Sequence, residues 1–319
     1  MNTPVSLFKY FTEKRIDLLQ NGLIRFTQPE EFNDPFEVFP YFKSMASTDL
    51  IDNEANTFDS EPNYYEKILE EILLQDNQFQ SLPPQGQALK RSLYKERLKI
   101  LKPEMAFQVK SLFSSAMKFE GAIKPIMLET IRKSINISFG ILCFTEKKDN
   151  LLMWSHYANS HRGFVLEFKP KHSYFDRRKK KTQIAEHLKK VRYSIKRPEF
   201  VFFDNNLSQE QMVDNWVGNF IWVKSEHWEY EKEWRIITTL NTSDKTIQKS
   251  GLPIHLFYFP YDAIKNIFLG CKMEREIKIE IVNLIKTQEK LKHICIYQAL
   301  PHEKNYSLEF KELDLNAIE

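Results

Sequence analysis

The chain has 319 residues, of which 42% are hydrophobic and 28% charged, and its formal net charge is +3 at pH 7. This composition is typical of a globular protein with a sizeable core, and so small a net charge gives no general reason to expect nucleic-acid binding. The 8 glycines are scattered along the chain, whereas a P-loop or a Rossmann turn needs clustered glycines. We therefore expect side chains to hold any bound nucleotide.

Neither a membrane segment nor a disulfide framework is indicated by the sequence. No run of about 18 apolar residues occurs, and the N-terminal residues lack the apolar stretch of a signal peptide. The three cysteines, Cys143, Cys271 and Cys295, form no CxxC pair, which speaks against a disulfide scaffold or a zinc ribbon. We expect a cytoplasmic protein with no membrane partner and no metal site.

Residues 1–45 are predicted to begin a sheet core. Their predicted elements are a strand at 5–11, a helix at 12–22, a strand at 23–29 and a turn at 32–37. Thr12 is the expected N-cap of the helix, and Gly22 follows its last turn. In the turn, Asn33 and Asp34 favour an Asx bend, and Pro35 disfavours helix at the residue before it.

Residues 46–135 are predicted to form a helical insert, because their apolar side chains recur with a 3.6-residue period. Residues 136–319 are predicted to complete an α+β core with a mixed or antiparallel sheet. The predicted elements there are strands at 135–145, 164–170, 191–195, 228–237, 253–259, 263–270 and 293–299, helices at 150–161 and 273–290, and a helical stretch ending near 223. The last two strands and the helix between them are expected to form a βαβ unit.

A basic loop interrupts this core at 171–190 and contains the run RRKKK at 177–181. Runs of like charge most often form solvated surface loops. A nucleic-acid contact through this run is the less favoured interpretation.

The segment WEYEKEWRII at 228–237 alternates as a strand would. On a strand, Glu229, Glu231, Glu233 and Arg235 would share one face, and Trp228 and Trp234 would be buried on the other. Neighbouring carboxylates repel, so the pKa of one should rise unless a cation intervenes, and Arg235 could pair with Glu233. One of these glutamates is thus a candidate for taking a proton or offsetting a positive charge. The alternative is a solvated face with a surface salt bridge.

The predicted helix at 150–161, capped by Asp149 or Asn150, supplies a second candidate set. His156 could bond a substrate hydroxyl or phosphate, and Tyr157 could stack on a ring. His156 and His161 are five residues apart, so they do not form an i, i+4 metal pair. The alternative is that His156 is a satisfied side chain in a half-buried helix.

The turn FNDPFE at 32–37 supplies a third set of candidate site residues. Asp34 and Glu37 flank the proline bend and could hold a cation or a ribose. They could equally cap the turn or fix an arginine. Because the three motifs interleave polar groups with aromatic ones, together they favour a pocket that stacks and orients a ring.

In order, LFKYF, FNDPFE, CFTEKKDNLLMWSHYANSHRGFVLEF and YEKEWR resemble a bacterial family catalogued as domain of unknown function (DUF) 2971. The chain more distantly resembles the ADP-ribosyltransferase superfamily, whose members use NAD without glycine-rich loops. That resemblance implies an ADP-ribosyltransferase-like fold with NAD as the substrate. It places Lys9 on the first strand, Phe144 and Thr145 on the middle strand, and Glu233 or Glu231 on the later one.

The same resemblance implies roles for side chains. Glu233, or Glu231 beside it, would accept the ribose 2′-hydroxyl and offset the oxocarbenium-like cation, with His156 as a further catalytic candidate. The implied cofactor-binding residues are Lys9 and Arg25 for the pyrophosphate, Tyr10, Tyr157 and Trp154 around the nicotinamide, and Asn33, Asp34, Thr145 and Arg235.

Three functions follow as hypotheses. The first is an NAD-dependent ADP-ribosyltransferase or NAD glycohydrolase, as a toxin or phage-defence effector with a macromolecular acceptor that the sequence does not identify. The second is a non-catalytic module that senses a nucleotide, a peptide or a phage component. The third is a metal-dependent nuclease that uses Asp34, Glu37 and the later glutamates.

Overall fold

The structure is a computed structural model. It describes residues 3–39, 41–47, 64–117, 123–177, 187–203 and 220–315, together with Asp49, Asn53, Ser208 and Gln211. The chain divides into two compact units. We call residues 1–39, 130–198 and 214–319 the core unit, and residues 40–129 and 199–213 the helical unit.

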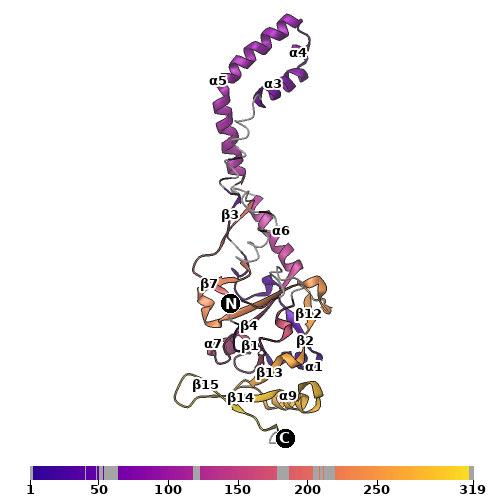
Figure 1. Cartoon of the computed structure of the whole chain (residues 1–319), viewed down its shortest axis with the longest axis vertical. Helices are drawn as coiled ribbons and strands as arrows, with labels where there is room; N and C mark the ends of the chain where they lie inside the picture. The colour runs from indigo at the N-terminus through magenta and orange to yellow at the C-terminus, as the bar shows by residue number, and fades with distance from the viewer. Residues whose placement is uncertain are drawn as a thin grey trace. The chain divides into compact units, whose positions relative to one another are not determined.

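The core unit is built on an eight-stranded sheet (Figure 1). In spatial order its strands are β15 (Leu308–Glu312), β14 (Cys295–Pro301), β13 (Ile264–Leu269), β5 (Phe164–Phe168), β1 (Leu7–Phe11), β4 (Phe139–Thr145), β10 (Glu233–Thr239) and β6 (Lys189–Lys190). Only β13 and β14 pair in parallel among these described strands; the other neighbours are antiparallel. The sheet is therefore mixed, which confirms the predicted α+β class.

Smaller sheets are present beside the eight-stranded sheet of the core unit. A three-stranded antiparallel sheet contains β11 (Lys245–Ile247), β12 (Ile254–Tyr258) and β2 (Leu23–Phe26). A bridge between Thr27 and Ile141 joins the end of β2 to β4. The short strands β7 (Arg192–Ser194) and β9 (Val223–Ser225) pair in parallel.

Three described α-helices lie wholly in the core unit, and the last part of α6 (Ile123–Ser138) belongs to it as well. The three are α1 (Asp17–Asn21), α7 (Leu151–Tyr157) and α9 (Arg275–Thr287), and the 3₁₀ turns are η1 (Glu13–Ile16), η2 (Pro29–Glu31), η3 (Ser173–Phe175), η4 (Glu226–Glu231), η5 (Leu240–Thr242), η6 (Tyr261–Ala263) and η7 (Glu289–Leu291). Gly22 ends α1 in the left-handed conformation (φ 65°), as the sequence predicts for a glycine at this place. The α9 helix connects the parallel strands β13 and β14, so the predicted βαβ unit is present.

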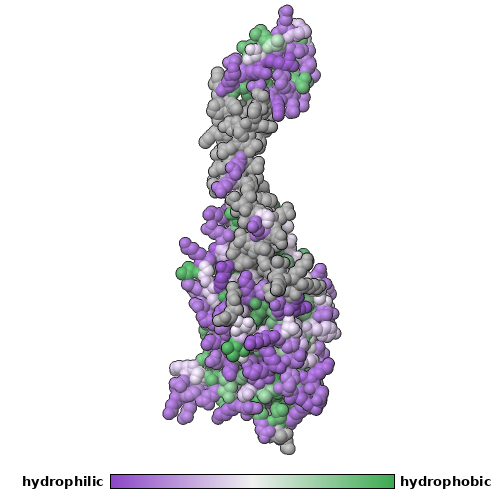
Figure 2. Space-filling view, viewed as in Figure 1, coloured by the Kyte–Doolittle hydropathy of each residue, from purple (hydrophilic) through white to green (hydrophobic). Residues whose placement is uncertain are grey.

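Alternation along the central strands buries side chains on both faces of the sheet. In β1, Leu7 and Phe11 belong to the main hydrophobic cluster, while Phe8 and Tyr10 belong to a second cluster with Trp154. Each face is covered, so β5 is buried at every position. Figure 2 shows hydrophilic side chains over much of the visible face of the core unit, with hydrophobic ones scattered among them.

The described part of the helical unit consists of helices of very different length and one strand pair. Its elements are β3 (Tyr41–Ala46), which pairs in parallel with β8 (Glu199–Phe203), and the helices α3 (Tyr64–Gln75), α4 (Asn77–Gln80), α5 (Pro84–Met117) and the first part of α6 (Ile123–Ser138). Asp76 caps α4, because its carboxylate accepts a hydrogen bond from Gln78 N at 2.9 Å. The predicted insert at 46–135 did not include the second segment, 199–213.

Four predicted elements differ from the structure. The strand predicted from residue 135 begins at Phe139, because α6 continues to Ser138. The helix after Asn150 ends at Tyr157, before three residues with positive φ at 159–161. Residues 199–203 form a strand where a helical stretch was predicted, and residues 228–231, predicted as the start of a strand, belong to the 3₁₀ turn η4 (Glu226–Glu231).

Other predictions fall partly outside the described residues. The basic run lies outside the described residues from residue 178 on, and so does most of the predicted helical stretch from 204 to 219. Within the part of the chain that the structure describes, no helix is long and apolar enough to cross a membrane.

Candidate functional site

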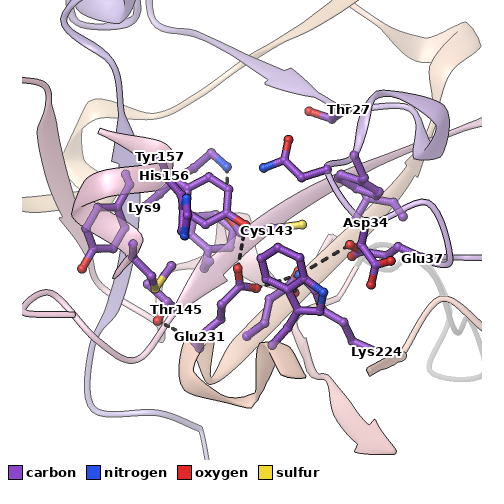
Figure 3. A pocket seen from close by; sticks show the side chains of 18 of the residues that line it. Lys9, Thr27, Asp34, Glu37, Cys143, Thr145, His156, Tyr157, Lys224 and Glu231 are labelled. Carbon is purple, nitrogen blue, oxygen red and sulfur yellow. Dashed lines mark hydrogen bonds and ion pairs between the residues drawn. The ribbon is translucent and has the colours of Figure 1, made fainter. Parts of the chain in front are cut away.

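A cavity of about 390 Å³ opens in the core unit (Figure 3). Its size lies within the range of small-molecule sites. The walls come from β1, β2, β4, α7, η4 and the turn at 31–37, with Phe8, Phe32, Met153, Tyr157 and Trp228 as the larger apolar and aromatic side chains. Lys9, Asp34, His156 and Glu233 all line this cavity although they are far apart in the sequence.

Three glutamates and two cations form a buried ion cluster at this cavity, comprising Glu37, Glu231, Glu233, Lys224 and Arg235. Lys224 Nζ lies 2.7 Å from Glu231 Oε2, 3.0 Å from Glu233 Oε2 and 3.4 Å from Glu37 Oε2. All five side chains are nearly inaccessible to solvent. Each charge is therefore neutralised mainly by the others.

Arg235 is the anchor of the ion cluster. It donates two hydrogen bonds to Glu233, from Nε to Oε1 at 2.7 Å and from Nη2 to Oε2 at 3.0 Å. Its Nη2 also donates to Glu37, and its Nη1 donates to Ile221 O at 2.6 Å. The predicted pairing of Arg235 with Glu233 is thus present, but Arg235 does not line the cavity.

The three carboxyl groups have different pKa values. Burial would raise the pKa of Glu233, but Arg235 and Lys224 outweigh it and hold that pKa well below its usual value. Burial dominates at Glu37 and Glu231, and raises both pKa values despite the nearby cations. Lys224 also loses hydration on burial, yet Glu233 and Glu37 raise its pKa. Lys224 therefore remains charged. The cluster contains one more carboxyl group than it has cations.

The backbone between the two later glutamates explains their convergence. Lys232 ends η4 in the left-handed conformation (φ 45°), and β10 starts at the next residue. Glu231 and Glu233 thereby both reach Lys224, although only Glu233 belongs to a strand. A left-handed non-glycine residue is uncommon and costs on the order of 1–3 kcal/mol.

Glu231 is the carboxyl group most closely tied to α7. Tyr157 donates its hydroxyl hydrogen to Glu231 Oε1 at 2.6 Å, and Thr145 donates its hydroxyl hydrogen to Glu231 O. Asn150 caps α7 through Met153 N at 3.1 Å and donates to Tyr230 O at 3.2 Å. These contacts fix η4 against α7 and orient the carboxyl group of Glu231.

Lys9 and Arg25, the cations expected to bind pyrophosphate, already bond to other groups of the chain. Lys9 Nζ donates to Cys143 O at 3.0 Å, and burial lowers the pKa of Lys9. Arg25 Nη2 lies 3.2 Å from Glu31, which also contacts Lys249. Both can still donate to a ligand, because an ammonium group has three donors and a guanidinium group five.

The turn at 32–37 is held as the sequence predicts. Asp34 accepts a hydrogen bond from Phe36 N at 2.9 Å, which makes the expected Asx bend. Asn33 is exposed at the cavity, and Glu37 joins the ion cluster. Val38 follows with φ 63°, a strained conformation for a β-branched residue, and its side chain is buried among apolar neighbours.

Two aromatic predictions were wrong. Trp154 does not line the cavity, since its side chain is fully buried in the second hydrophobic cluster and donates Nε1–H to Lys148 O at 2.8 Å. Trp228 is not a core anchor, because η4 leaves it half-buried at the cavity, with Lys224 Nζ 4.9 Å from its ring centre. Trp234 is buried as predicted.

Of the other predicted residues, some line the cavity and one lies at the surface away from it. Tyr10 and Thr145 line the cavity, and Tyr10 donates its hydroxyl hydrogen to Lys147 O at 3.0 Å. His156 lines it as an exposed side chain. Glu229 does not join Glu231 on a shared face, because η4 turns it to the surface, where it pairs with Lys232 at 2.8 Å.

Lys224 is the functional candidate that sequence reasoning missed. The only signal for it was a single lysine directly after the apolar run at 220–223. A lone charge next to buried aromatic residues needs a partner inside the protein, and here it meets three carboxyl groups. Among the described residues, no group of three His, Cys, Asp or Glu side chains is arranged to hold a metal ion.

One comparison with known proteins covers a segment that contributes to this site. The family model described as "Protein of unknown function (DUF2971)" matches residues 153–236, and this confirms the resemblance to that family. The matched segment contains Tyr157, Lys224, Glu231, Glu233 and Arg235. No curated protein and no solved structure matches the chain.

Proposed function

We propose that the chain is an ADP-ribosyltransferase-like enzyme that breaks the nicotinamide–ribose bond of NAD in this cavity. The observation that carries the proposal is the position of Glu231. Its carboxyl group is buried at an aromatic-lined cavity and is held between the Tyr157 hydroxyl and Lys224. The proposal extends to NAD hydrolysis, in which water is the acceptor, and to transfer onto a macromolecule.

Charge supports this reaction class. The nicotinamide ring of oxidised NAD is cationic, and the aromatic rings of Phe8, Tyr157 and Trp228 suit a cationic ring. When the bond breaks, its electron pair goes to the ring nitrogen and positive charge develops on the ribose. The ion cluster contains three carboxyl groups and two cations, so its net charge is negative when all three carboxyl groups are ionised, and this favours the positive charge that develops on the ribose.

Glu231 is better suited than Glu233 to contact the ribose. Both oxygens of Glu233 are bonded by Arg235, and one also by Lys224. Glu231 has one oxygen on Tyr157 and one on Lys224, and neither partner is bidentate. Glu231 thus accepts the 2′-hydroxyl, Glu233 fixes Lys224, and Lys9 offers its remaining donors to phosphate.

Nicotinamide release tests the proposal. Purified protein is incubated with NAD, alone and with candidate acceptors, and nicotinamide is quantified by chromatography. Glu231→Gln should reduce the rate on the order of 100- to 1,000-fold, as loss of other preorganised electrostatic groups does. Glu229→Gln is the matched control, because Glu229 belongs to the same turn but is exposed, and it should leave the rate unchanged. Wild-type protein that releases no nicotinamide under any of these conditions would contradict the proposal.

A second function, a non-catalytic sensing module, is favoured by one observation. The oxygens of Glu233 are saturated by partners within the chain, as expected of a group that only shapes a binding site. This function predicts saturable NAD binding by calorimetry with the ligand recovered intact. Binding without turnover would therefore select the sensor over the enzyme.

A further inference from the structure

A second cavity, of about 290 Å³, shares Asp34, Glu37 and Lys224 with the first. Its other walls come from residues 36–39, 194–198 and 220–227. The buried ion cluster thus contributes to the walls of both cavities. Of the three polar-aromatic motifs, the turn at 32–37 lines the second cavity, whereas the helix α7 and the glutamates of 228–235 do not.

Every exposed ionisable side chain that lines the second cavity is basic: Lys196, Arg197 and His227. The two acidic lining residues are buried and already bonded. Asp34 accepts from Phe36 N at 2.9 Å, and Glu37 is held by Arg235 and Lys224. Lys196 makes no ion pair within the described residues. The accessible charge of this cavity is therefore positive, which favours an anionic ligand.

An arginine stacked on an exposed ring stands at this cavity. The ring of Phe36 is 60% exposed, and the Arg197 guanidinium lies 5.3 Å from the ring centre. Arg197 Nη2 also donates to Phe39 O at 2.7 Å, which fixes the side chain to the turn. A positioned guanidinium recognises phosphate through its planar set of donors. The apolar side chain of Ile195, 81% exposed, lines the same cavity.

We infer that the second cavity binds a small ligand that joins a planar ring to a phosphate group, of the class of a nucleoside monophosphate. The ring packs against Phe36 and Ile195, and the phosphate meets Arg197 and Lys196. The volume of about 290 Å³ lies at the lower end of small-molecule sites, which favours a ligand as small as a mononucleotide. This site is separate from NAD cleavage and does not depend on it.

Calorimetric titration with AMP, adenosine and inorganic phosphate tests this site. AMP should bind the wild-type chain more tightly than adenosine or phosphate does. Arg197→Gln should weaken AMP binding about 10-fold or more, because a charge-assisted contact to phosphate is lost. It should leave adenosine binding nearly unchanged. Phe36→Ala should weaken both AMP and adenosine.

Three further variants show whether AMP occupies this cavity. Arg192→Gln removes an exposed arginine of β7 that lines neither cavity, and should leave AMP binding unchanged. His156→Ala changes an exposed side chain that lines only the first cavity, and should also leave AMP binding unchanged. Lys196→Gln provides a second test if Arg197→Gln lowers the melting temperature, because within the described residues the Lys196 side chain makes no ion pair that could hold the turn.

Two results would overturn the inference. One is the absence of AMP binding to the wild-type chain at millimolar concentration. The other is AMP binding that survives Arg197→Gln, Lys196→Gln and Phe36→Ala but is lost in Trp228→Leu, which would assign AMP to the first cavity. Neither result bears on NAD cleavage, which is measured by nicotinamide release.

Discussion

The two parts of the segment 226–239 differ in burial: η4 is partly or fully exposed up to Tyr230, whereas Glu231 and nearly all of β10 are buried. In η4 (Glu226–Glu231), the charged side chain of Glu229 is exposed and pairs with Lys232 at the surface. In β10 (Glu233–Thr239), every residue is buried except the last. Tertiary position, and not the local pattern, therefore decides whether a glutamate is solvated or enclosed.

The reason lies in the neighbours of β10. This strand pairs with β4 on one side and β6 on the other, and apolar clusters cover the sheet. A charge in such a strand must be neutralised within the protein, because burial of an unpaired charge is very costly. Arg235 and Glu233 meet this need for each other, with Glu37 and Lys224 beside them.

The largest effect should come from removing the central cation of the buried part. Arg235→Met leaves Glu233 and Glu37 without a main partner, and should lower the free energy of unfolding by about 3–5 kcal/mol. Lys232→Met is the matched control, because it removes a solvent-exposed ion pair with Glu229, and it should change the free energy of unfolding by less than about 1 kcal/mol. Chemical denaturation of both variants gives the two values. Equal losses would mean that the two parts do not differ as described.

The two tryptophans of the segment, Trp228 in η4 and Trp234 in β10, allow the burial of uncharged side chains to be compared. Trp234→Ala should cost about 3–5 kcal/mol of unfolding free energy, because the ring is buried in the main cluster. Trp228→Ala should cost clearly less, since that ring is only half-buried at the cavity. Denaturation curves of the pair would contradict this if Trp228→Ala were the more damaging change.

The pH dependence of stability should report the unbalanced carboxyl group. The pKa of Glu231 is raised in the folded state above its ordinary value of 4.5, so the folded chain holds a proton that the unfolded chain releases. Stability therefore falls as pH rises from about 4.5 towards the folded-state pKa, by no more than about 1.4 kcal/mol per pH unit for one proton.

Glu231→Gln should remove that part of the slope. Melting temperatures of the wild type and the variant, measured between pH 4 and pH 8, should diverge in favour of the variant as pH rises. Parallel curves would show that Glu231 titrates at its ordinary pKa. The same titration of Glu229→Gln should lack this divergence, because Glu229 is exposed and the pKa of its carboxyl group is lowered by Lys232 and not raised by burial.

The smallest effect should come from the contact that fixes η4 to α7. Asn150→Ala removes both the cap of Met153 N and the bond to Tyr230 O, and should cost about 1 kcal/mol. Asp149→Ala, one residue earlier, should change stability less, because Asp149 does not cap the helix. The two unfolding free energies measured side by side decide which residue is the cap.

Much of the core could be predicted because its signals are local. Gly22 marks the end of α1, Asn150 caps α7, and Asp34 makes the bend at 32–37 through bonds to residues two or three positions away. The βαβ unit at the C-terminal end follows from apolar runs separated by a helical period. Each of these features depends on interactions within a few residues.

The candidate site was predictable only in part. The sequence drew attention to Glu231, Glu233, Tyr157 and Lys9, and all four line the cavity. It misassigned Trp154, because a helical face does not reveal whether the sheet covers it. It missed Lys224, whose importance depends on carboxyl groups contributed by other segments.

The sequence by itself determined the α+β class, the glycine end of α1, the bend at Asp34 and the set of polar-aromatic motifs, because hydrophobic period and turn chemistry act over short distances, whereas the expected cap Thr12 makes no side-chain cap bond. Tertiary structure alone decided that Lys232 takes a left-handed conformation, that Glu229 faces solvent, and that Glu37 joins the later glutamates. The physical reason is that the cost of burying a charge depends on partners brought from distant parts of the chain.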